Sequence, residues 1–123
     1  ILKGKVSPEA ILKNPIDLTG SVPTEQYRTT LEATLKDKNS DMILLILLLQ
    51  TPLISPEIIP IIKETHQKHP HKPLIVISTG GHFTEMYVKQ IEELGIPCYS
   101  YTNNAARAIK ALWVYYKERT FKR

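Results

Sequence analysis

Met42-Ile-Leu-Leu-Ile-Leu-Leu-Leu49 is a run of eight consecutive apolar residues with no polar residue among them. A strand with one solvated face would alternate polar and apolar residues, because successive side chains point to opposite faces. A run that is apolar on both faces is typical of a central strand in a parallel sheet, which is covered on both sides. A membrane span needs about 20 apolar residues, so the run is too short to be one.

The residues next to this run decide between a strand and a buried helix, which periodicity alone leaves open. Turn-forming residues stand on both sides of it, Asn39-Ser40-Asp41 before and Gln50-Thr51-Pro52 after. These flanks and the short length favour the strand. We therefore predict a central buried strand over residues 42–49, with the other elements packed around it.

Length and composition predict one ordinary globular domain, because 42% of the 123 residues are hydrophobic and 23% are charged. The chain begins at Ile1 without an initiating Met, and we expect a fragment or one domain of a longer protein. The single cysteine, Cys98, cannot form an internal disulfide, which predicts a cytoplasmic protein. Cys98 lies in an apolar stretch and is expected to be a small core residue.

The net charge of +4 owes much to a basic tail made of Lys117, Arg119, Lys122 and Arg123. Such a tail can bind nucleic acid or an anionic surface. More often it is a solvated chain end, so we expect neither nucleic acid nor a membrane as the partner.

Periodic apolar residues predict the elements on either side of the central strand. Further strands are expected over residues 14–20, 74–78 and 96–101. Helices are expected over residues 24–36, with Thr24 as N-cap, from either Ser55-Pro56 or near Pro60 to Gln67, over 83–94 and from 102 or 103 to 116. Their predicted buried faces are Tyr27, Leu31 and Leu35; Phe83, Tyr87, Ile91 and Leu94; and Ala105, Ile109, Leu112 and Tyr116. The alternation predicts an open parallel α/β sheet of about four strands with helices on both faces, a flavodoxin-like or Rossmann-like three-layer fold.

Candidate binding residues lie in the loops that follow the predicted strands, because ligands of open parallel sheets bind beyond the carboxyl ends of the strands. The stretch Thr79-Gly80-Gly81 is the best candidate for an anion or phosphate, since glycines and a helix N-terminus let backbone amides approach negative charge. Asp17, Thr19 and Gly20 are further candidates in the first such loop. A lone Gly-Gly is more often only a tight turn, and neither a dinucleotide fingerprint nor a P-loop is present in the sequence.

His82 is the weak candidate for a catalytic residue, as a phosphate acceptor or a general acid–base group. No carboxylate that would orient its ring is evident from the sequence, so a structural histidine at a helix start is the alternative. Three further histidines, His66, His69 and His71, raise the hypothesis of a metal-binding site. However, Pro70 interrupts their spacing, and no Cys or Asp lies among them. No metal site is predicted there.

Several motifs, in chain order, resemble one known family. They are Asn14-Pro-Ile-Asp-Leu-Thr-Gly20, a helix ending in Lys36-Asp-Lys-Asn-Ser-Asp41 before the apolar strand, Lys72-Pro73-Leu-Ile-Val, Gly80-Gly81, Leu94-Gly-Ile-Pro-Cys-Tyr99 and Asn104-Ala-Ala-Arg-Ala-Ile109. Together they resemble the C-terminal, flavodoxin-like domain of the NDP-forming acyl-CoA synthetases, which include ADP-forming acetate–CoA ligases and succinyl-CoA synthetase. The resemblance covers residues 13–116, and the first motif with Gly-Ile-Pro-Cys-Tyr is its most specific part.

The resemblance implies a domain of a ligase that converts an acyl-CoA, ADP and phosphate to acid, ATP and CoA, and the reverse. It implies CoA, ADP or ATP, and Mg²⁺ in the complete enzyme, with the CoA-binding and ATP-grasp folds in other domains or a partner subunit. His82 does not align with the family's phosphohistidine, and Gln50-Thr51-Pro52 stands where succinyl-CoA synthetase relatives carry Gly-Gly. The chain is therefore expected to be inactive alone, and a non-catalytic ligand-binding or regulatory module, for example one fused to an acetyltransferase, is the alternative.

Overall fold

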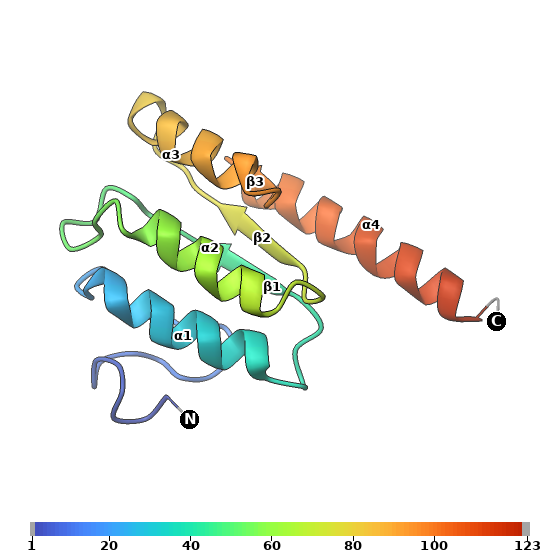
Figure 1. Ribbon diagram of the computed structural model, residues 1–123, viewed down its shortest axis with the longest axis horizontal. Helices are drawn as coiled ribbons and strands as arrows, with labels where there is room; N and C mark the ends of the chain where they lie inside the picture. The colour runs from blue at the N-terminus through green and yellow to red at the C-terminus, as the bar shows by residue number, and fades with distance from the viewer. Residues whose placement is uncertain (1, 122–123) are drawn as a thin grey trace.

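The computed structural model describes residues 2–121, which form an α/β domain (Figure 1). In chain order the elements are α1 (Thr24–Lys36), β1 (Ile43–Ile46), α2 (Ile58–Lys68), β2 (Leu74–Ile77), α3 (His82–Glu93), β3 (Cys98–Tyr99) and α4 (Thr102–Phe121). The strands form a parallel sheet in the order β1-β2-β3. The predicted class, an open parallel sheet with helices on both faces, is confirmed, with three strands in place of about four.

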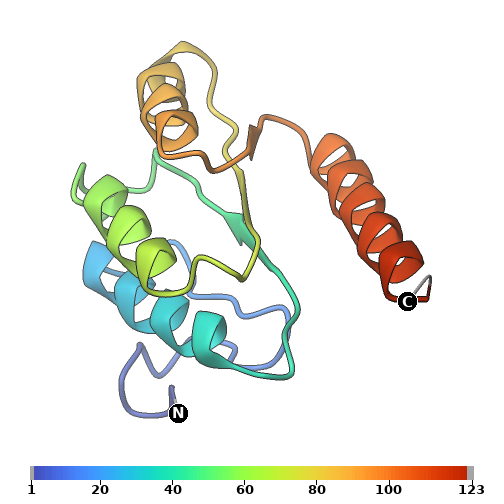
Figure 2. The same cartoon turned by 45° about the vertical axis from the view of Figure 1, so that its right-hand side comes forward.

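The helices form two unequal layers on the sheet. Figure 2 shows α1, α2 and α3 in a row on one face, while α4 lies by itself on the other. The larger core lies under the row, where Leu35, Leu47 and Ile62 are 2% exposed or less. The smaller core consists of Ile75 and Ile77 of β2 under Ala105 of α4.

The apolar run of residues 42–49 contains a strand as predicted, although it covers only Ile43–Ile46, and the prediction that it is central is wrong. β1 lies at the end of the sheet, and the fully buried central strand is β2. The exposed side chains of the run alternate with covered ones, because one face packs on the larger core and the other is only partly covered by the described chain. An edge strand with an uncovered apolar face has the same sequence pattern as a central strand.

The strand predicted over residues 14–20 is also absent from the described sheet. A single antiparallel bridge joins Ile11 to Asp17. Pro15 has no N–H to give to a ladder, and Asp17 Oδ1 accepts the N–H of Thr19 at 2.8 Å, which turns the chain. The strand predicted over 96–101 is reduced to Cys98–Tyr99.

The first helix has the predicted bounds and buries the predicted Tyr27, Leu31 and Leu35. Its N-cap is Pro23 rather than Thr24. The Thr24 hydroxyl instead accepts the N–H of Ser55 at 2.8 Å and lies 3.2 Å from the carbonyl oxygen of Leu53. Thr24 therefore ties the start of α1 to the loop between β1 and α2.

The far end of α1 is held by a lysine just before β2. Lys72 Nζ donates to the carbonyl oxygen of Asp37 and lies 3.1 Å from Ser40 Oγ. A cation at a helix C-terminus stabilises the carbonyl groups that lack helical partners. Ion pairs between Arg28 and Glu64 and between Glu32 and Lys68 connect α1 to α2.

Each of two predicted buried faces contains one residue that is exposed instead. Phe83 is 59% exposed, because α3 turns Thr84 and Ile91 inward instead. Tyr116 is 57% exposed, because α4 continues beyond the sheet after its contact at Ala105. Pro60 lies in the first turn of α2, where its missing N–H costs no helical hydrogen bond.

Candidate functional site

The predicted candidate loops meet along the carboxyl edge of the sheet. Gln50, which follows β1, donates from Nε2 to the carbonyl oxygen of Thr79 after β2, at 3.1 Å. A side-chain carbon added at Gly20 would lie 3.8 Å from Thr51. The structure thus brings the loops after β1 and β2, together with the Asp17–Gly20 turn, to one rim, as expected for a parallel sheet.

An open hollow of about 370 Å³ lies on this rim between the start of α3 and the end of β3. Thr79, Gly80 and Gly81 form one wall, and Ser100 and Tyr101 form another. The hollow includes the best of the predicted anion-binding stretches.

Gly80 allows the loops to approach closely. A Cβ at this position would lie 1.9 Å from Gln50 Nε2 and 2.5 Å from Thr84 Cγ2. Gly81, the N-cap of α3, has φ +58°, a value that side-chain-bearing residues rarely adopt. Each glycine is therefore required, the first by space and the second by backbone conformation.

The start of α3 presents amide groups without a side-chain cap among the described residues. Thr84 Oγ1 donates to the carbonyl oxygen of Gly81 at 2.9 Å and closes the first turn. A helix N-terminus of this kind favours negative charge. The charged residues of the hollow act in the opposite direction, since Glu85 and Glu92 outnumber Lys89. The described residues therefore do not form a complete phosphate or nucleotide site.

Sequence reasoning missed Glu85, Lys89 and Glu92 as lining residues. Their spacing of four and three residues places them on one face of a helix, which is a readable signal. The sequence does not indicate that this face of α3 lies next to the end of β3.

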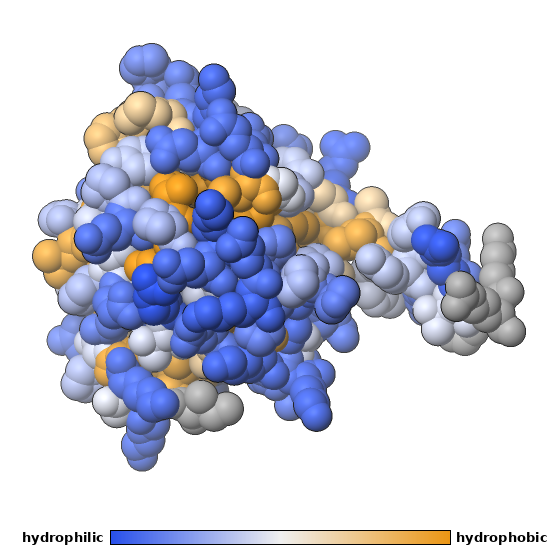
Figure 3. All heavy atoms as spheres, in the orientation of Figure 1, coloured by the Kyte–Doolittle hydropathy of each residue, from blue (hydrophilic) through white to orange (hydrophobic). Residues whose placement is uncertain are grey.

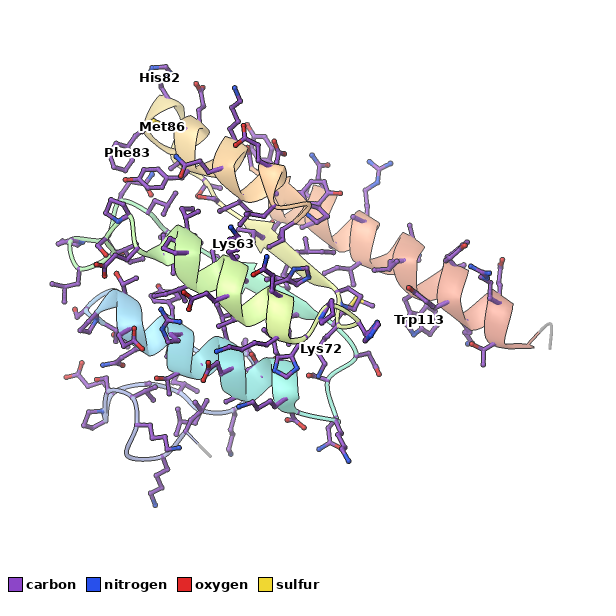
Figure 4. All side chains as sticks on the ribbon, in the orientation of Figure 1. Lys63, Lys72, His82, Phe83, Met86 and Trp113 are labelled. Atoms are coloured by element: carbon purple, nitrogen blue, oxygen red, sulfur yellow. The ribbon has the colours of Figure 1, made fainter. Side chains whose placement is uncertain are left out.

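His82 stands at the tip of α3 and points away from the body, beside Phe83 and Met86 (Figure 4). Its Nδ1 lies 2.8 Å from Glu85 Oε2, so the ring has the carboxylate neighbour that the sequence did not reveal. The His82 side chain is 98% exposed and that of Glu85 is 68% exposed. Solvent therefore competes with the contact, and a catalytic role for His82 stays a prediction.

The candidates Asp17, Thr19 and Gly20 form a compact turn. Thr19 has φ +68°, unusual for a β-branched residue, and its N–H is held by Asp17 Oδ1. Burial raises the pKa of Tyr27, and the nearby Asp17 carboxylate raises it further. Turn formation accounts for these contacts, and a ligand role for the turn also stays a prediction.

Cys98 and the histidines lie outside the hollow. Burial, and then the nearby Glu92 carboxylate, raises the pKa of the Cys98 thiol to about 11, which makes it a poor nucleophile. Burial lowers the pKa of His66. Within residues 2–121 no group of three or more His, Cys, Asp or Glu side chains could hold a metal ion, and no helix is long and apolar enough to cross a membrane.

A parallel three-layer domain with polar loops gathered at its carboxyl edge is the arrangement that the sequence motifs implied. The chain belongs to the Ligase-CoA domain family, whose family model matches residues 2–120. It is similar to the alpha subunits of two ADP-forming acetate–CoA ligases of Pyrococcus furiosus: 31% identical to that of ligase II over 117 residues, 90% of this chain, and 29% identical to that of ligase I over 119 residues, 95% of this chain.

A solved relative has the same fold over nearly the whole chain. This is the apo form of the dinucleotide-forming acetyl-coenzyme A synthetase 1 of Candidatus Korarchaeum cryptofilum, with a TM-score of 0.84 and 28% identity over 98% of this chain. The resemblance to the CoA-ligase family seen in the sequence is thereby confirmed. The chain spans about a quarter of these relatives, 25% and 26% of the two alpha subunits and 26% of the solved chain.

Proposed function

We propose that this chain is a domain of an ADP-forming acyl-CoA ligase that completes an interdomain phosphoryl-transfer site and does not catalyse ligation alone. The observation that carries the proposal is the family match over residues 2–120 to a domain that makes up about a quarter of acetate–CoA ligase alpha subunits. The complete enzyme would convert an acyl-CoA, ADP and phosphate to acid, ATP and CoA, and the reverse.

The carboxyl edge of the sheet is the part of this domain that would face the reaction. Its hollow is open on the outside, and its charges do not form a phosphate cradle, which fits a surface completed by another domain. CoA, the nucleotide and Mg²⁺ would be held chiefly by CoA-binding and ATP-grasp partners, and the uncapped amide groups at the start of α3 would face the shared site.

Domain replacement tests this proposal. This chain would replace the 117 matched residues in the alpha subunit of Pyrococcus furiosus acetate–CoA ligase II, and ATP formation from acetyl-CoA, ADP and phosphate would be measured in the complete enzyme. We expect activity that the subunit without these residues lacks, and none from the isolated chain. Acetate- and CoA-dependent ADP formation by the isolated chain would refute its incompleteness, and an assembled but inactive replacement would refute the ligase role.

The alternative is a ligand-binding or regulatory module of the same fold. The open hollow between α3 and β3 favours it, because its volume of about 370 Å³ is within the range of small-molecule sites. Calorimetry of the isolated chain with CoA, acetyl-CoA, ADP and ATP separates the two functions. Tight binding of one of these ligands by the chain alone supports the module, and no binding supports the ligase domain.

A further inference from the structure

The side chain of Gln50 connects two loops at the carboxyl edge of the sheet. Gln50 follows the apolar run that contains β1 and reaches across to the loop after β2, where its Nε2 donates to the carbonyl oxygen of Thr79 at 3.1 Å. It also lies directly over Gly80, because a Cβ added at Gly80 would be 1.9 Å from Gln50 Nε2 and 2.8 Å from Gln50 Cδ. The hydrogen bond and this close contact act on the same peptide group, the one between Thr79 and Gly80.

The peptide group between Thr79 and Gly80 has two accessible orientations, because glycine adopts φ of either sign at little cost. Turning over a peptide group before glycine exchanges the directions of its C=O and N–H, and it is the difference between turns of type I and type II. In a trans peptide group the C=O and the N–H point in opposite directions. The hydrogen bond from Gln50 therefore selects one orientation, in which the Thr79 carbonyl group faces Gln50.

The N–H of Gly80 points away from Gln50 in this orientation. The strand order is β1-β2-β3, so Gln50 approaches the loop from the β1 side, whereas the hollow lies on the β3 side, beside Ser100 and Tyr101. Gly80 lines the hollow, and Gln50 is not among the described residues that do. Within residues 2–121 the Gly80 N–H has no hydrogen-bond acceptor. The selected orientation thus directs an unpaired amide donor toward the hollow.

Charged side chains of this chain do little to attract an anion into the hollow. Lys89 is the one basic residue among the described lining residues, and Glu85 and Glu92 oppose it. At this edge, at the upper left of Figure 3, hydrophobic and weakly polar residues lie between the strongly hydrophilic ones. Positive charge for an anion would therefore come from another domain, and this chain would contribute oriented backbone amides.

We propose that Gln50 is a positioning residue of the shared site, which turns the Gly80 N–H toward the hollow so that this amide donates to the inorganic phosphate of the ligase reaction. The inference rests on the proposed function, which supplies the phosphate and the partner domain that completes the site. Gln50 itself does not touch the phosphate, because its Nε2 is bonded to Thr79. The amide that it orients makes the contact, and a hydrogen bond to an anion is about twice as strong as one between neutral groups.

Two substitutions at Gln50 separate orientation from packing. Gln50→Glu keeps the size of the side chain, so Gly80 stays covered, but an ionised carboxylate cannot donate to the Thr79 carbonyl oxygen and repels it. The carboxylate accepts the Gly80 N–H instead, which favours the opposite orientation of the peptide group. Gln50→Ala removes both the cover and the hydrogen bond. If Gln50 only fills space, Gln50→Ala should have the larger effect, whereas the proposal predicts the larger effect for Gln50→Glu.

NMR of the full chain measures the orientation directly. The nuclear Overhauser effects from the Gly80 N–H to the Hα and to the N–H of Thr79 change in relative intensity when the peptide group turns over. We expect the wild-type chain to show the orientation of the structure and Gln50→Glu to show the opposite one. Gln67→Glu, the same change of charge at an exposed residue of α2, is the control and should resemble the wild type. An unchanged pattern in Gln50→Glu would overturn the proposal.

Kinetics of the domain-replaced ligase measure the consequence for phosphate. We expect Gln50→Glu to raise the KM for phosphate about tenfold or more and Gln50→Ala to raise it less, with kcat within about twofold, because the lost contact serves binding. An unchanged KM for phosphate, or a raised KM for acetyl-CoA in its place, would refute the inference and leave the ligase role standing. An assembled but inactive wild-type replacement would refute the ligase role and the phosphate contact with it, while the NMR result would still decide the peptide orientation.

Discussion

The two faces of the sheet differ in how they are covered. On one face, α1, α2 and α3 bury a continuous core that includes Leu31, Leu47 and Ile58. On the other, α4 touches β2 and β3, and three residues, Ile75, Ile77 and Ala105, are buried. Both faces of β1 and β2 are equally apolar in sequence. The difference lies in what covers them, because the first face holds the larger core and the second leaves Leu44 and Ile46 of β1 exposed.

The largest effect is expected from a cavity in the fully covered face. Ile62→Ala should lower the free energy of unfolding by about 2–5 kcal/mol, because Ile62 is 0% exposed between α2 and the sheet. Ile46→Ala, on the exposed side of β1, should change it by less than about 0.5 kcal/mol. Urea unfolding measures both. A loss of more than about 2 kcal/mol from Ile46→Ala would contradict the contrast between the two faces.

A smaller effect is expected where α4 rests on the sheet. Ala105→Leu should cost about 1–3 kcal/mol, because Ala105 is 0% exposed against Ile75 and Ile77. Ala106→Leu, one residue further and exposed, is the matched control and should be close to neutral. Thermal unfolding followed by circular dichroism compares them. If the two substitutions behave alike, α4 does not pack on the sheet through Ala105.

A further effect on stability is expected at the carboxyl edge of the sheet, where the candidate site lies. Gly80→Ala should destabilise the domain by about 1–2 kcal/mol, because its Cβ would meet Gln50 Nε2 and Thr84 Cγ2. A Gly80→Ala, Gln50→Ala double variant lacks the Gln50 side chain that the new Cβ would meet, so it should recover part of the lost stability. Stabilities from urea unfolding give the coupling. If the changes in unfolding free energy caused by the two substitutions simply add, Gln50 does not pack over Gly80.

The smallest effect concerns pH. Burial raises the pKa of Cys98 to about 11 from an ordinary value near 9, so the folded state holds the thiol proton more tightly than the unfolded state. This contribution to stability is complete below about pH 9 and is lost as the pH rises to about 11. Cys98→Ala should therefore flatten the decline of stability between these pH values, measured by urea unfolding. An unchanged profile would place the decline in other groups, such as Tyr27, whose pKa is also raised.

The sequence was sufficient where local periodicity and burial agree. The bounds of α1 and its buried Tyr27, Leu31 and Leu35 follow from a four-residue spacing. The meeting of the loops at one rim follows from parallel strand direction. Gly95, just after α3, has φ +78°, the left-handed conformation that commonly ends a helix.

Other features depend on which elements meet in space. Residues 42–49 have the pattern of a central strand, yet only neighbours along the sheet decide whether both faces are covered. The lining residues Lys89 and Glu92 become part of a hollow because β3 ends beside α3. Phe83 was assigned to a buried face because its spacing to Tyr87 fits one, but the inward stripe begins one residue later, at Thr84.

The two attachments of α1 have a mechanical consequence. Thr24 fastens one end of the helix to the loop at the carboxyl edge, and Lys72 fastens the other end to the entrance of β2. Because both ends of α1 are attached, the helix cannot tilt about one end without breaking the hydrogen bonds at the other. A displacement of the loops at the carboxyl edge would therefore be transmitted along α1 to the opposite edge of the sheet. The domain would respond to its neighbours as one rigid body.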